Sequence, residues 1–446
     1  MFDYAGAGST RPHIKQKERD AALKICVVGL GYIGLPLSAV FADKGVTVTG
    51  VDIDRKIVDA VNRGEVHIEE PGLPELVARC VKDGVLSASQ TPVTADVFII
   101  AVPTPNKLDQ HYSCDLSLVK SACKSVIPRL QTGNTVIVES TIAPGSMEQE
   151  ICPLFERAGR EIGRDIFLAH CPERILPGKM LHELASEGRI VGGITDECSD
   201  RAAGVYSLIT NGVISKTSAK TAELAKCVEN TFRDVNIAFA NELAKICCEL
   251  DINCYDVIKL ANRHKRVNIL QPGPGVGGHC LAVDPYFIHA RAPQTAKIIK
   301  LSREVNSGMP EFVAGKAAKL LGGIDNPKIA VLGIAFKGNV DDYRQSPALE
   351  IIRILKEKGY DVQACDPYAR SDMLVPFPQA MTGAHLALIL TDHDEYRSID
   401  KENLAGMMAR PVLFDTRGVV EICENSKLEV VNYGNIWAYE TGDAGE

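Results

Sequence analysis

A glycine-rich segment that ends in a cysteine carries the most reactive group of side chains in the chain. Residues 268–285 read NILQPGPGVGGHCLAVDP, with Cys280 just after the glycines and Asp284 four residues further on. Glycine takes positive φ angles and lets the backbone approach a ligand that a Cβ would keep away. A thiolate is the strongest common nucleophile near neutral pH, so the segment predicts covalent catalysis by Cys280; an inert buried cysteine is the alternative. The glycines are Gly273, Gly275, Gly277 and Gly278.

Composition limits the kinds of protein that this chain can be. With 446 residues it is too long for one ordinary core, so we expect two or three domains. The 49 lysines and arginines are outnumbered by 57 aspartates and glutamates, a net charge of −8. This balance argues against a nucleic-acid partner but allows a local basic pocket for one small anion. The 14 cysteines are scattered without paired CxxC spacings, so we expect mostly reduced core thiols and no bound metal.

The N-terminal residues 1–22 form a polar stretch without the apolar run of a signal peptide. No run elsewhere approaches the length needed to cross a bilayer. We therefore expect a poorly ordered tail, a cytoplasmic protein and no membrane partner.

A dinucleotide-binding fingerprint follows the tail. An apolar strand is predicted over residues 24–29, followed by the turn GLGYIG, a helix, and a second strand over residues 46–51 that ends at Asp52. These glycines shape the turn, admit the pyrophosphate and allow close helix packing. An acid at Asp52 bonds the adenosine ribose and favours NAD over NADP, although Arg55 nearby weakens that preference. The cofactor-binding candidates are Gly29, Gly31, Tyr32, Ile33, Gly34, Asp52 and Arg55.

Further apolar strands are predicted over residues 97–102, 135–139 and 167–170. In an open α/β sheet, ligands lie outside the carboxyl ends of the strands, so Thr104 and Thr141 fall at the cofactor cleft. Ordinary helix capping is the alternative for each threonine. The third of these strands leads into a loop with an acid and a base, Glu173 and Arg174.

A long helix is predicted over residues 221–250, which contain no glycine or proline and carry apolar residues on more than one face. Lys226, Asn230 and Arg233 share one stripe of this helix, either solvated or functional. The apolar surface exceeds what one neighbouring domain would cover, so we expect at least a homodimer. A basic cluster with His264 and Arg266 follows, before the glycine-rich segment.

From residue 327 the pattern of the N-terminal half repeats, with strands predicted over residues 328–333 and 360–366. The turn between them reads GIAFKG and lacks the middle fingerprint glycine, so we expect another phosphate-bearing ligand rather than a second dinucleotide. The predicted fold is α/β, with two Rossmann-like doubly wound parallel-sheet domains joined by a central helical segment. The predicted boundaries are 1–22 for the tail, 23–215 for the NAD-binding domain, 216–325 for the helical segment and 326–446 for the second Rossmann-like domain.

From about Leu23 to Trp437 the chain resembles the UDP-glucose/GDP-mannose dehydrogenase family, on stretches such as HIEEPGL, AVPTP, CPERILPG and FKGNVDDYRQSPA. The resemblance implies a four-electron oxidation of the C6 hydroxyl of a UDP-sugar to a carboxylate, with two NAD consumed. Cys280 would form a thiohemiacetal and then a thioester. His279 before the cysteine and Val283 before Asp284 depart from the glucose-type enzymes. The implied substrate is therefore UDP-N-acetyl-D-mannosamine, for surface polysaccharide synthesis, with UDP-N-acetylglucosamine or UDP-glucose as alternatives.

The resemblance also assigns roles to individual residues. Lys226 and Asn230 would stabilise the developing oxyanion, Glu173 and Asp284 would position or deprotonate water, and Thr141 would hold ordered solvent. His279 is not expected to serve as the base for Cys280, because adjacent residues in an extended turn usually point apart. Arg344 would lie near the cofactor. The implied substrate-binding residues are Arg174, Ile175, Lys226, Asn230, Arg233, His264, Arg266, Gly277, Phe336, Lys337 and Arg417.

Two other classes of function are compatible with the same fold. A non-catalytic NAD-binding regulator would need none of Cys280, Lys226, Asn230 and Asp284. A one-step hydroxyacid dehydrogenase would need a lysine on the long helix but no cysteine, so the ratio of NADH to product separates it from a four-electron enzyme.

Overall fold

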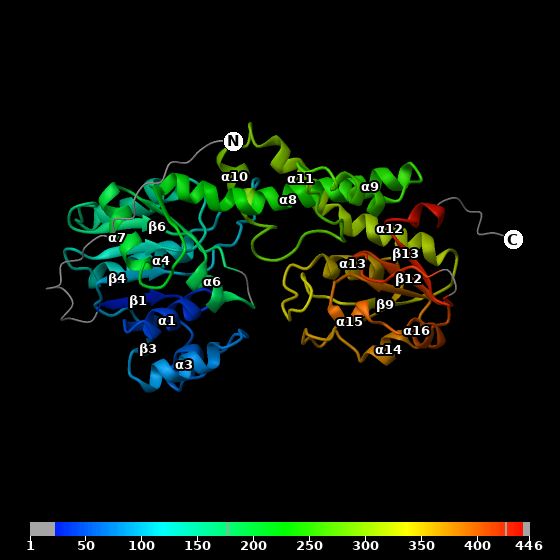
Figure 1. Ribbon diagram of the computed structural model, residues 1–446, viewed down its shortest axis with the longest axis horizontal. Coiled ribbons are helices and arrows are strands. Elements are labelled where there is room, and N and C mark those ends of the chain that lie inside the picture. Colours follow the sequence, from blue (N-terminus) through cyan, green and yellow to red (C-terminus); the bar gives the residue numbers. More distant parts are fainter. Residues whose placement is uncertain (1–22, 176–177, 424–425, 440–446) are drawn as a thin grey trace. The chain divides into compact units, whose positions relative to one another are not determined.

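The computed structural model describes residues 23–175, 178–423 and 426–439. The predicted tail over residues 1–22 lies outside them. The chain forms two compact units, one up to Cys227 and one from Val228, and each is described by itself (Figure 1). The four predicted domain boundaries remain a prediction. No helix of the described residues is long and apolar enough to span a bilayer.

The N-terminal unit is built on an eight-stranded sheet with the order β3-β2-β1-β4-β5-β6-β7-β8 (Figure 1). Neighbouring strands are parallel except for β6 and β7. The order reverses between β1 and β4, and this is where an open sheet binds its ligand. The strands are β1 Lys24–Val28, β2 Thr47–Val51, β3 Leu86–Ser89, β4 Val97–Ile100, β5 Thr135–Val138, β6 Phe167–His170, β7 Arg189–Gly193 and β8 Ile214–Ser218.

Helices cover the sheet of this unit, and its central strands are buried along nearly their whole length. Continuous apolar runs such as VFII and TVIV are typical of parallel strands covered on both faces, as the sequence predicts. The helices are α1 Gly34–Asp43, α2 Arg55–Asn62, α3 Leu73–Lys82, α4 Ser117–Val126, η2 Ile127–Arg129, η3 Met147–Ile151, α5 Cys152–Arg157, α6 Met180–Ser186 and α7 Asp196–Tyr206.

Helix α8 spans Ala219–Glu249, 31 residues, close to the predicted range. Good helix formers without glycine or proline explain its length. The division between the two compact units falls within this helix, after Cys227.

The C-terminal unit contains a five-stranded, fully parallel sheet with the order β10-β9-β11-β12-β13. This is the second common order of doubly wound folds, so both predicted Rossmann-like sheets are confirmed. The strands are β9 Lys328–Leu332, β10 Asp361–Cys365, β11 Leu386–Ile389, β12 Val412–Asp415 and β13 Glu429–Asn432, and the helices are α9 Cys254–Ala261, α10 Asp284–Arg291, α11 Lys297–Ser307, α12 Met309–Leu321, α13 Pro347–Glu357, α14 Phe377–Met381, α15 Asp394–Arg397, α16 Lys401–Met407 and η4 Ile436–Tyr439.

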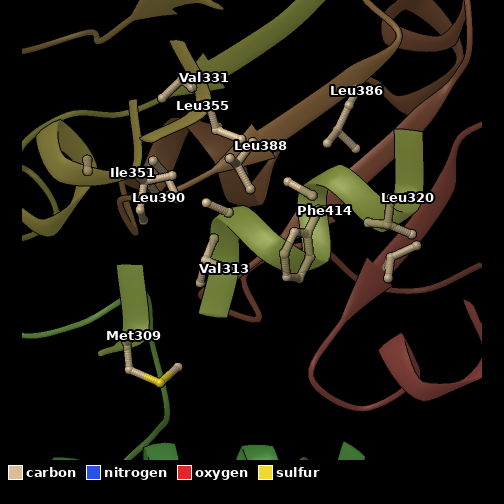
Figure 2. Packing of buried hydrophobic residues seen from close by; sticks show 14 of the residues in the cluster. Met309, Val313, Leu320, Val331, Ile351, Leu355, Leu386, Leu388, Leu390 and Phe414 are labelled. Atoms are coloured by element: carbon tan, nitrogen blue, oxygen red, sulfur yellow. The ribbon is translucent and has the colours of Figure 1, made fainter. Parts of the chain in front are cut away.

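The core of the C-terminal unit lies between this sheet and helices α12 and α13. Figure 2 shows Val313 and Leu320 of α12 beside Phe414 of β12 and Leu388 of β11. All four side chains are nearly or completely inaccessible to solvent. This packing supports the loops at the carboxyl edge of the sheet, where the second turn lies.

Candidate active site

The fingerprint turn of the N-terminal unit has the geometry that its glycines predict. Gly29 has φ +100°, and a Cβ there would lie 2.4 Å from the carbonyl oxygen of Ala101, the residue after β4. A Cβ on Gly34 would lie 1.8 Å from the Gly29 oxygen. A Cβ on Gly31, in contrast, would meet no atom within 4 Å. The first and third glycines therefore allow the turn to pack, while the second leaves open space for a ligand.

The N-terminus of α1 is suited to a phosphate group. The helix begins at Gly34 without an acidic residue in its first turn and without a side-chain cap. Its N–H groups and its dipole therefore favour an anion such as a pyrophosphate. Tyr32 is exposed beside this turn and Ile33 is half-buried.

Asp52 closes strand β2 and is held against the fingerprint turn. Its Oδ2 accepts from the N–H of Leu30 at 3.0 Å, and its Oδ1 accepts from the N–H of Asp54 at 2.9 Å. The carboxylate is half-buried, so lone pairs are left for a ribose hydroxyl. Arg55 is exposed and its guanidinium lies 3.5 Å from Asp59.

We expect replacement of Asp52 by serine to weaken NAD binding by roughly 1 kcal/mol or somewhat more, the scale of one charge-assisted hydrogen bond. NADP should be used relatively better, because the charge that repels its 2′-phosphate is gone. Calorimetric titration with both cofactors measures the two effects. Asp52→Asn is the matched control, since it keeps an acceptor for the turn and removes only the charge. An unchanged cofactor preference in both variants would mean that Asp52 does not contact the ribose.

The loops after β4 and β5 lie together at the carboxyl edge of the sheet. The hydroxyl of Ser140 accepts from the N–H of Val102 at 2.9 Å and donates to its carbonyl oxygen at 2.7 Å. Thr104 and Thr141, one in each loop, are half-buried. In the described part of the chain neither threonine caps a helix, because the following helices have other N-cap residues, Leu116 and Ser146. The capping alternative therefore does not account for them.

Glu173 belongs to a buried cluster of two carboxyl groups and one guanidinium. Arg189, in β7, lies 2.9 Å from Glu173 and 3.1 Å from Glu139, and all three side chains are at most 8% exposed. The second oxygen of Glu173 accepts from the N–H groups of Arg174 at 2.6 Å and Ile175 at 3.0 Å. Glu173 therefore fixes the loop that carries two predicted substrate-binding residues.

The two carboxyl groups of this cluster differ in acidity. Burial raises the pKa of Glu139 well above its usual value, and Arg189 offsets only part of that rise. Burial also acts against ionisation of Glu173, but Arg189 and the Arg174 N–H hold the pKa of Glu173 below its usual range. The Oε2 atom of Glu139 is buried without a hydrogen-bond partner among the described residues, and this favours the neutral form. Glu173, in contrast, is a fixed carboxylate with N–H donors on both oxygens.

The glycine-rich loop packs against the segment that follows β9. A Cβ on Gly277 would lie 2.5 Å from the carbonyl oxygen of Gln345, and one on Gly278 would lie 3.0 Å from the ring of Phe336. Gly278 also has φ +82°. Side chains at these positions would push the loop away, so the predicted need for glycine has a steric cause as well.

Cys280 is exposed, so the alternative of an inert buried cysteine is wrong. Of the 14 cysteines, twelve are buried free thiols, and Cys423 is the other exposed one. The carbonyl oxygen of Cys280 accepts from the N–H groups of Val283 at 3.1 Å and Asp284 at 2.9 Å. This turn places the thiol directly before helix α10.

Asn230 and Asp284, two of the predicted catalytic residues, form a hydrogen bond with each other. The Asn230 amide donates to Asp284 Oδ2 at 2.6 Å, and both side chains are buried. Lys226, one helical turn before Asn230 on α8, is 9% exposed. No ion pair of Lys226 is found among the described residues, so its charge is available for a developing negative charge on a substrate. His170 is neutral, because burial lowers its pKa to about 4.

The acid at the second Rossmann-like turn is not accessible to a ribose, in contrast to the acid at the first turn. Asp366 corresponds to Asp52 in position and accepts from the N–H groups of Ile334 at 2.7 Å and Ala335 at 3.2 Å. His393 Nε2 lies 3.1 Å from the same carboxylate, and both side chains are 0% exposed. Against the effect of burial, these hydrogen bonds lower the pKa of Asp366 to about 2. Its oxygens are already occupied, which leaves no access for a ribose.

Several predicted ligand residues lie on this same edge of the C-terminal unit. Arg417 is half-buried and pairs with Asp392 at 3.0 Å, while Lys337 is exposed beside the half-buried Phe336. Arg344 is exposed and forms two hydrogen bonds with Asp342, at 2.8 and 2.9 Å.

The remaining predicted residues are placed less tightly. His279 Nε2 lies 3.8 Å from Asp342, and burial together with Arg344 lowers the pKa of His279. The backbone N–H of Arg266 donates to His264 Nδ1 at 3.4 Å. Arg174 donates to the carbonyl oxygen of Gly188 at 3.2 Å. Exposed side chains are those of Arg174, Arg233, His264 and Arg266.

The fold and the site define a nucleotide-dependent dehydrogenase of the two-Rossmann type. The features that define it are a dinucleotide-binding sheet, a second Rossmann-like unit without a free ribose-binding acid, and an exposed thiol. The chain belongs to the UDP-glucose/GDP-mannose dehydrogenase family. Residues 23–210 match its NAD binding domain, residues 220–308 its central domain and residues 330–422 its UDP binding domain. NAD is accordingly the cofactor of this enzyme.

Among curated relatives, the UDP-N-acetyl-D-mannosamine dehydrogenase of Campylobacter jejuni is 47% identical over 399 residues, which cover 85% of this chain and 98% of that protein. The NDP-N-acetyl-D-galactosaminuronic acid dehydrogenase of Ralstonia solanacearum is 43% identical, over 89% of this chain and 96% of that protein. Among solved structures, the UDP-N-acetyl-mannosamine dehydrogenase Cap5O of Staphylococcus aureus has a TM-score of 0.87 and 48% identity, over 93% of this chain and 99% of that one.

Proposed function

We propose that this enzyme is cytoplasmic and oxidises UDP-N-acetyl-D-mannosamine at C6 to the corresponding uronate. The product would be used for the synthesis of a surface polysaccharide. The observation that supports this most directly is that relatives over 40% identical along most of the chain carry this activity in their names. The exposed Cys280, close in sequence to the paired Asp284, supplies the nucleophile that a four-electron oxidation needs.

The fingerprint turn and Asp52 would hold NAD, which would supply the hydride acceptor for both oxidations of C6. In the proposed sequence, the Cys280 sulfur adds to the aldehyde carbon, and the oxygen takes a proton to give a thiohemiacetal. A free aldehyde would hydrate or escape, whereas the thiol keeps the carbon in place. Loss of the second hydride from C6 and of the hydroxyl proton leaves a thioester, which water hydrolyses to the acid and the free thiol.

Lys226 and Asn230 stabilise the oxyanion in this proposal, as a cation and an amide donor can. Asp284 is held by Asn230 and orients the hydrolytic water. Thr141, in the N-terminal unit, is proposed to hold ordered solvent. Glu173 acts as a fixed carboxylate that shapes the loop of Arg174 and Ile175. The UDP group lies against the basic residues of the C-terminal unit, among them Lys337 and Arg417.

A panel of UDP-sugars tests the substrate. We expect the highest kcat/KM for UDP-N-acetyl-D-mannosamine, measured by NADH formation and compared with UDP-N-acetylglucosamine, UDP-glucose and GDP-mannose. UDP-N-acetylgalactosamine belongs in the panel, because a relative at 43% identity is named for a galactosaminuronic acid. Faster turnover of any of the four would replace the proposed substrate. Two NADH per sugar are expected, and one NADH would indicate a simple alcohol dehydrogenase.

Helix α8 supports a proposed homodimer. Large apolar side chains recur on one face of the helix and at the residue that follows it, and they are strongly exposed: Val228 47%, Phe232 67%, Phe239 51%, Ile246 40% and, directly after the helix, Leu250 61%. Counted from Val228, the other four lie 4, 11, 18 and 22 residues further along. These spacings are close to whole numbers of helical turns, so the side chains share one face. Such a patch on a soluble protein is typical of a protein interface, and a two-fold pair of identical helices would cover it.

We expect Phe239→Glu to convert the dimer to a monomer at micromolar concentration, because a carboxylate would be buried in an apolar interface. Light scattering measures the mass. Leu118→Glu is the matched control: this leucine of α4 is 43% exposed but lies on another helix. A monomeric parent protein, or a dimer that survives Phe239→Glu unchanged, would exclude this face as the interface.

A further inference from the structure

Helix α8 carries a buried polar face along its length. Glu223, Lys226, Asn230, Asp234 and Asn241 are all at least nine-tenths buried. Their spacings place them on one side of the helix. Burial of so many polar groups is costly unless each has a partner, so the face indicates that α8 holds other segments in place.

The C-terminal part of this face forms a directional chain of hydrogen bonds. The N–H of Gly273 donates to Asn241 Oδ1 at 2.8 Å, and the Asn241 amide donates to Asn306 Oδ1 at 2.9 Å. Asn306 in turn donates to Asp234 Oδ1 at 2.8 Å. Because the backbone N–H of Gly273 can only donate, the direction of every amide in the chain is set. Arg303 neutralises the carboxylate at 2.6 Å.

Gly273 is held from its other side as well. Its carbonyl oxygen accepts from the hydroxyl of Tyr433 at 3.2 Å. A Cβ at this position would lie 2.5 Å from Arg417 Nη1. Both polar groups of one backbone unit are thus fixed by buried side chains, Asn241 on α8 and Tyr433 just after β13.

Gly273, which Asn241 and Tyr433 hold in this way, lies seven residues before Cys280. Between them, the chain has positive φ angles at Gly275 and Gly278, which glycine adopts readily because it has no Cβ, and glycine also loses more conformational freedom on folding than other residues. A loop so rich in glycine cannot hold a thiol in one place by itself. Its position depends on fixed points, and Gly273 is the one at its start.

We propose that Asn241 and Tyr433 are positioning residues that fix the start of the glycine-rich loop, so that the Cys280 thiol meets the aldehyde before the aldehyde escapes. The inference rests on the proposed role of Cys280. Neither residue touches the substrate; each acts through the backbone of Gly273. The bound substrate class is the UDP-sugar aldehyde formed in the first oxidation.

The test uses two variants of the full-length enzyme, Asn241→Ala and Tyr433→Phe. The second variant keeps the ring, whose centroid lies 6.1 Å from that of the Phe414 ring, and loses one hydrogen bond. With UDP-N-acetyl-D-mannosamine and NAD, we expect the NADH yield to fall from two per sugar toward one, with free aldehyde trapped by a hydrazine. Acid formation should slow roughly tenfold to hundredfold in Asn241→Ala, at nearly unchanged KM, and less in Tyr433→Phe.

Amide exchange of residues 270–280 supplies a readout apart from activity. It should accelerate in both variants, while peptides from β9 and α13 keep their protection. Asn134→Ala is the matched control, because this buried asparagine caps a turn through Gln131, at 2.7 Å, outside the site. It should cost stability without changing the NADH yield.

Two NADH per sugar at the parent rate in both variants would overturn the proposal, and so would unchanged exchange of residues 270–280. Cys280→Ala separates these outcomes from a failure of the proposed function. If that variant makes acid at the parent rate, Cys280 is not the tether, whatever the exchange of the loop shows.

Discussion

Replacement of Cys280 by alanine should abolish formation of the uronate, with a loss on the order of a thousandfold or more, as for the removal of other covalent nucleophiles. The side chain is exposed and makes no contribution to a core, so the fold should survive. The first hydride transfer needs no sulfur, so slow oxidation to the aldehyde should persist. Product analysis by mass spectrometry, together with NADH yield, measures both steps.

Cys280→Ser tests the leaving-group chemistry more sharply. A serine hydroxyl has nearly the same shape as the thiol but a far higher pKa than the roughly 8.5 of a free cysteine, so it attacks poorly. An ester formed at this position should hydrolyse more slowly than a thioester. We therefore expect a covalent sugar adduct, visible as a mass increase of the intact protein, with little turnover.

Cys423→Ser is the matched control for both variants, since Cys423 is the other exposed thiol. It should leave the rate and the stoichiometry unchanged. Parent rates of acid formation in Cys280→Ala and Cys280→Ser would remove Cys280 from the mechanism.

Replacement of Arg189 by methionine should destabilise the protein by about 3–5 kcal/mol, the usual cost of breaking a buried ion pair by removing one partner. The change leaves Glu139 and Glu173 buried without their shared cation. It also removes the contact of the guanidinium with the ring of Tyr206, at 4.6 Å. Urea unfolding at neutral pH measures the loss. Arg164→Met is the control, because this arginine pairs with Glu161 on the surface and its loss should cost little.

Glu139→Gln should make the protein more stable than the parent at high pH, whereas Arg189→Met should make it less stable. The folded-state pKa of Glu139 is raised above its ordinary value of 4.5, so its contribution to stability is fully present below pH 4.5 and is lost as the pH rises through the folded pKa. Glutamine has no proton to lose. Its stability relative to the parent protein should therefore increase steadily from pH 4.5 upward.

Thermal unfolding of both proteins over that pH range checks the result. The charged and titratable groups that face Glu139 are Arg189, Glu173, Cys171 and Tyr206, and all of them remain in the variant. A pH-independent difference between the two proteins would mean that Glu139 does not hold the proton.

Local patterns predicted the geometry of the fingerprint turn. The spacing of Gly29, Gly31 and Gly34 determines a turn whose neighbours lie within a few residues, and the acid at Asp52 follows one helix later. The role of Glu139 could not be predicted in this way. Its partners are Glu173, in the loop after β6, and Arg189, in β7, and only the order of the sheet brings β5, β6 and β7 together. One signal was present, since a glutamate ends the apolar run TVIVE.

The polar stripe of α8 shows a second limit. Lys226 and Asn230 are buried as expected of a functional stripe, but Arg233, on the same side of the helix, is exposed. Asp234 and Asn241 extend the buried face instead. Helical spacing gives the side of a helix on which a residue lies, while the width of the covered area depends on which segments pack there. The bonds of Asn241 to residues 273 and 306 could be seen only in the structure.

The shared geometry of Asp52 and Asp366 bears on how cofactor preference can change during evolution. In both Rossmann-like units the acid accepts from the N–H that follows the first glycine of the turn, Leu30 in one and Ile334 in the other. The acid therefore serves the backbone whether or not a ribose is present. A lineage that adopts a phosphorylated cofactor must keep an acceptor at this position, because an unsatisfied N–H in the turn would weaken the fold. Asparagine, serine or threonine are open to such a lineage, and alanine or glycine are disfavoured.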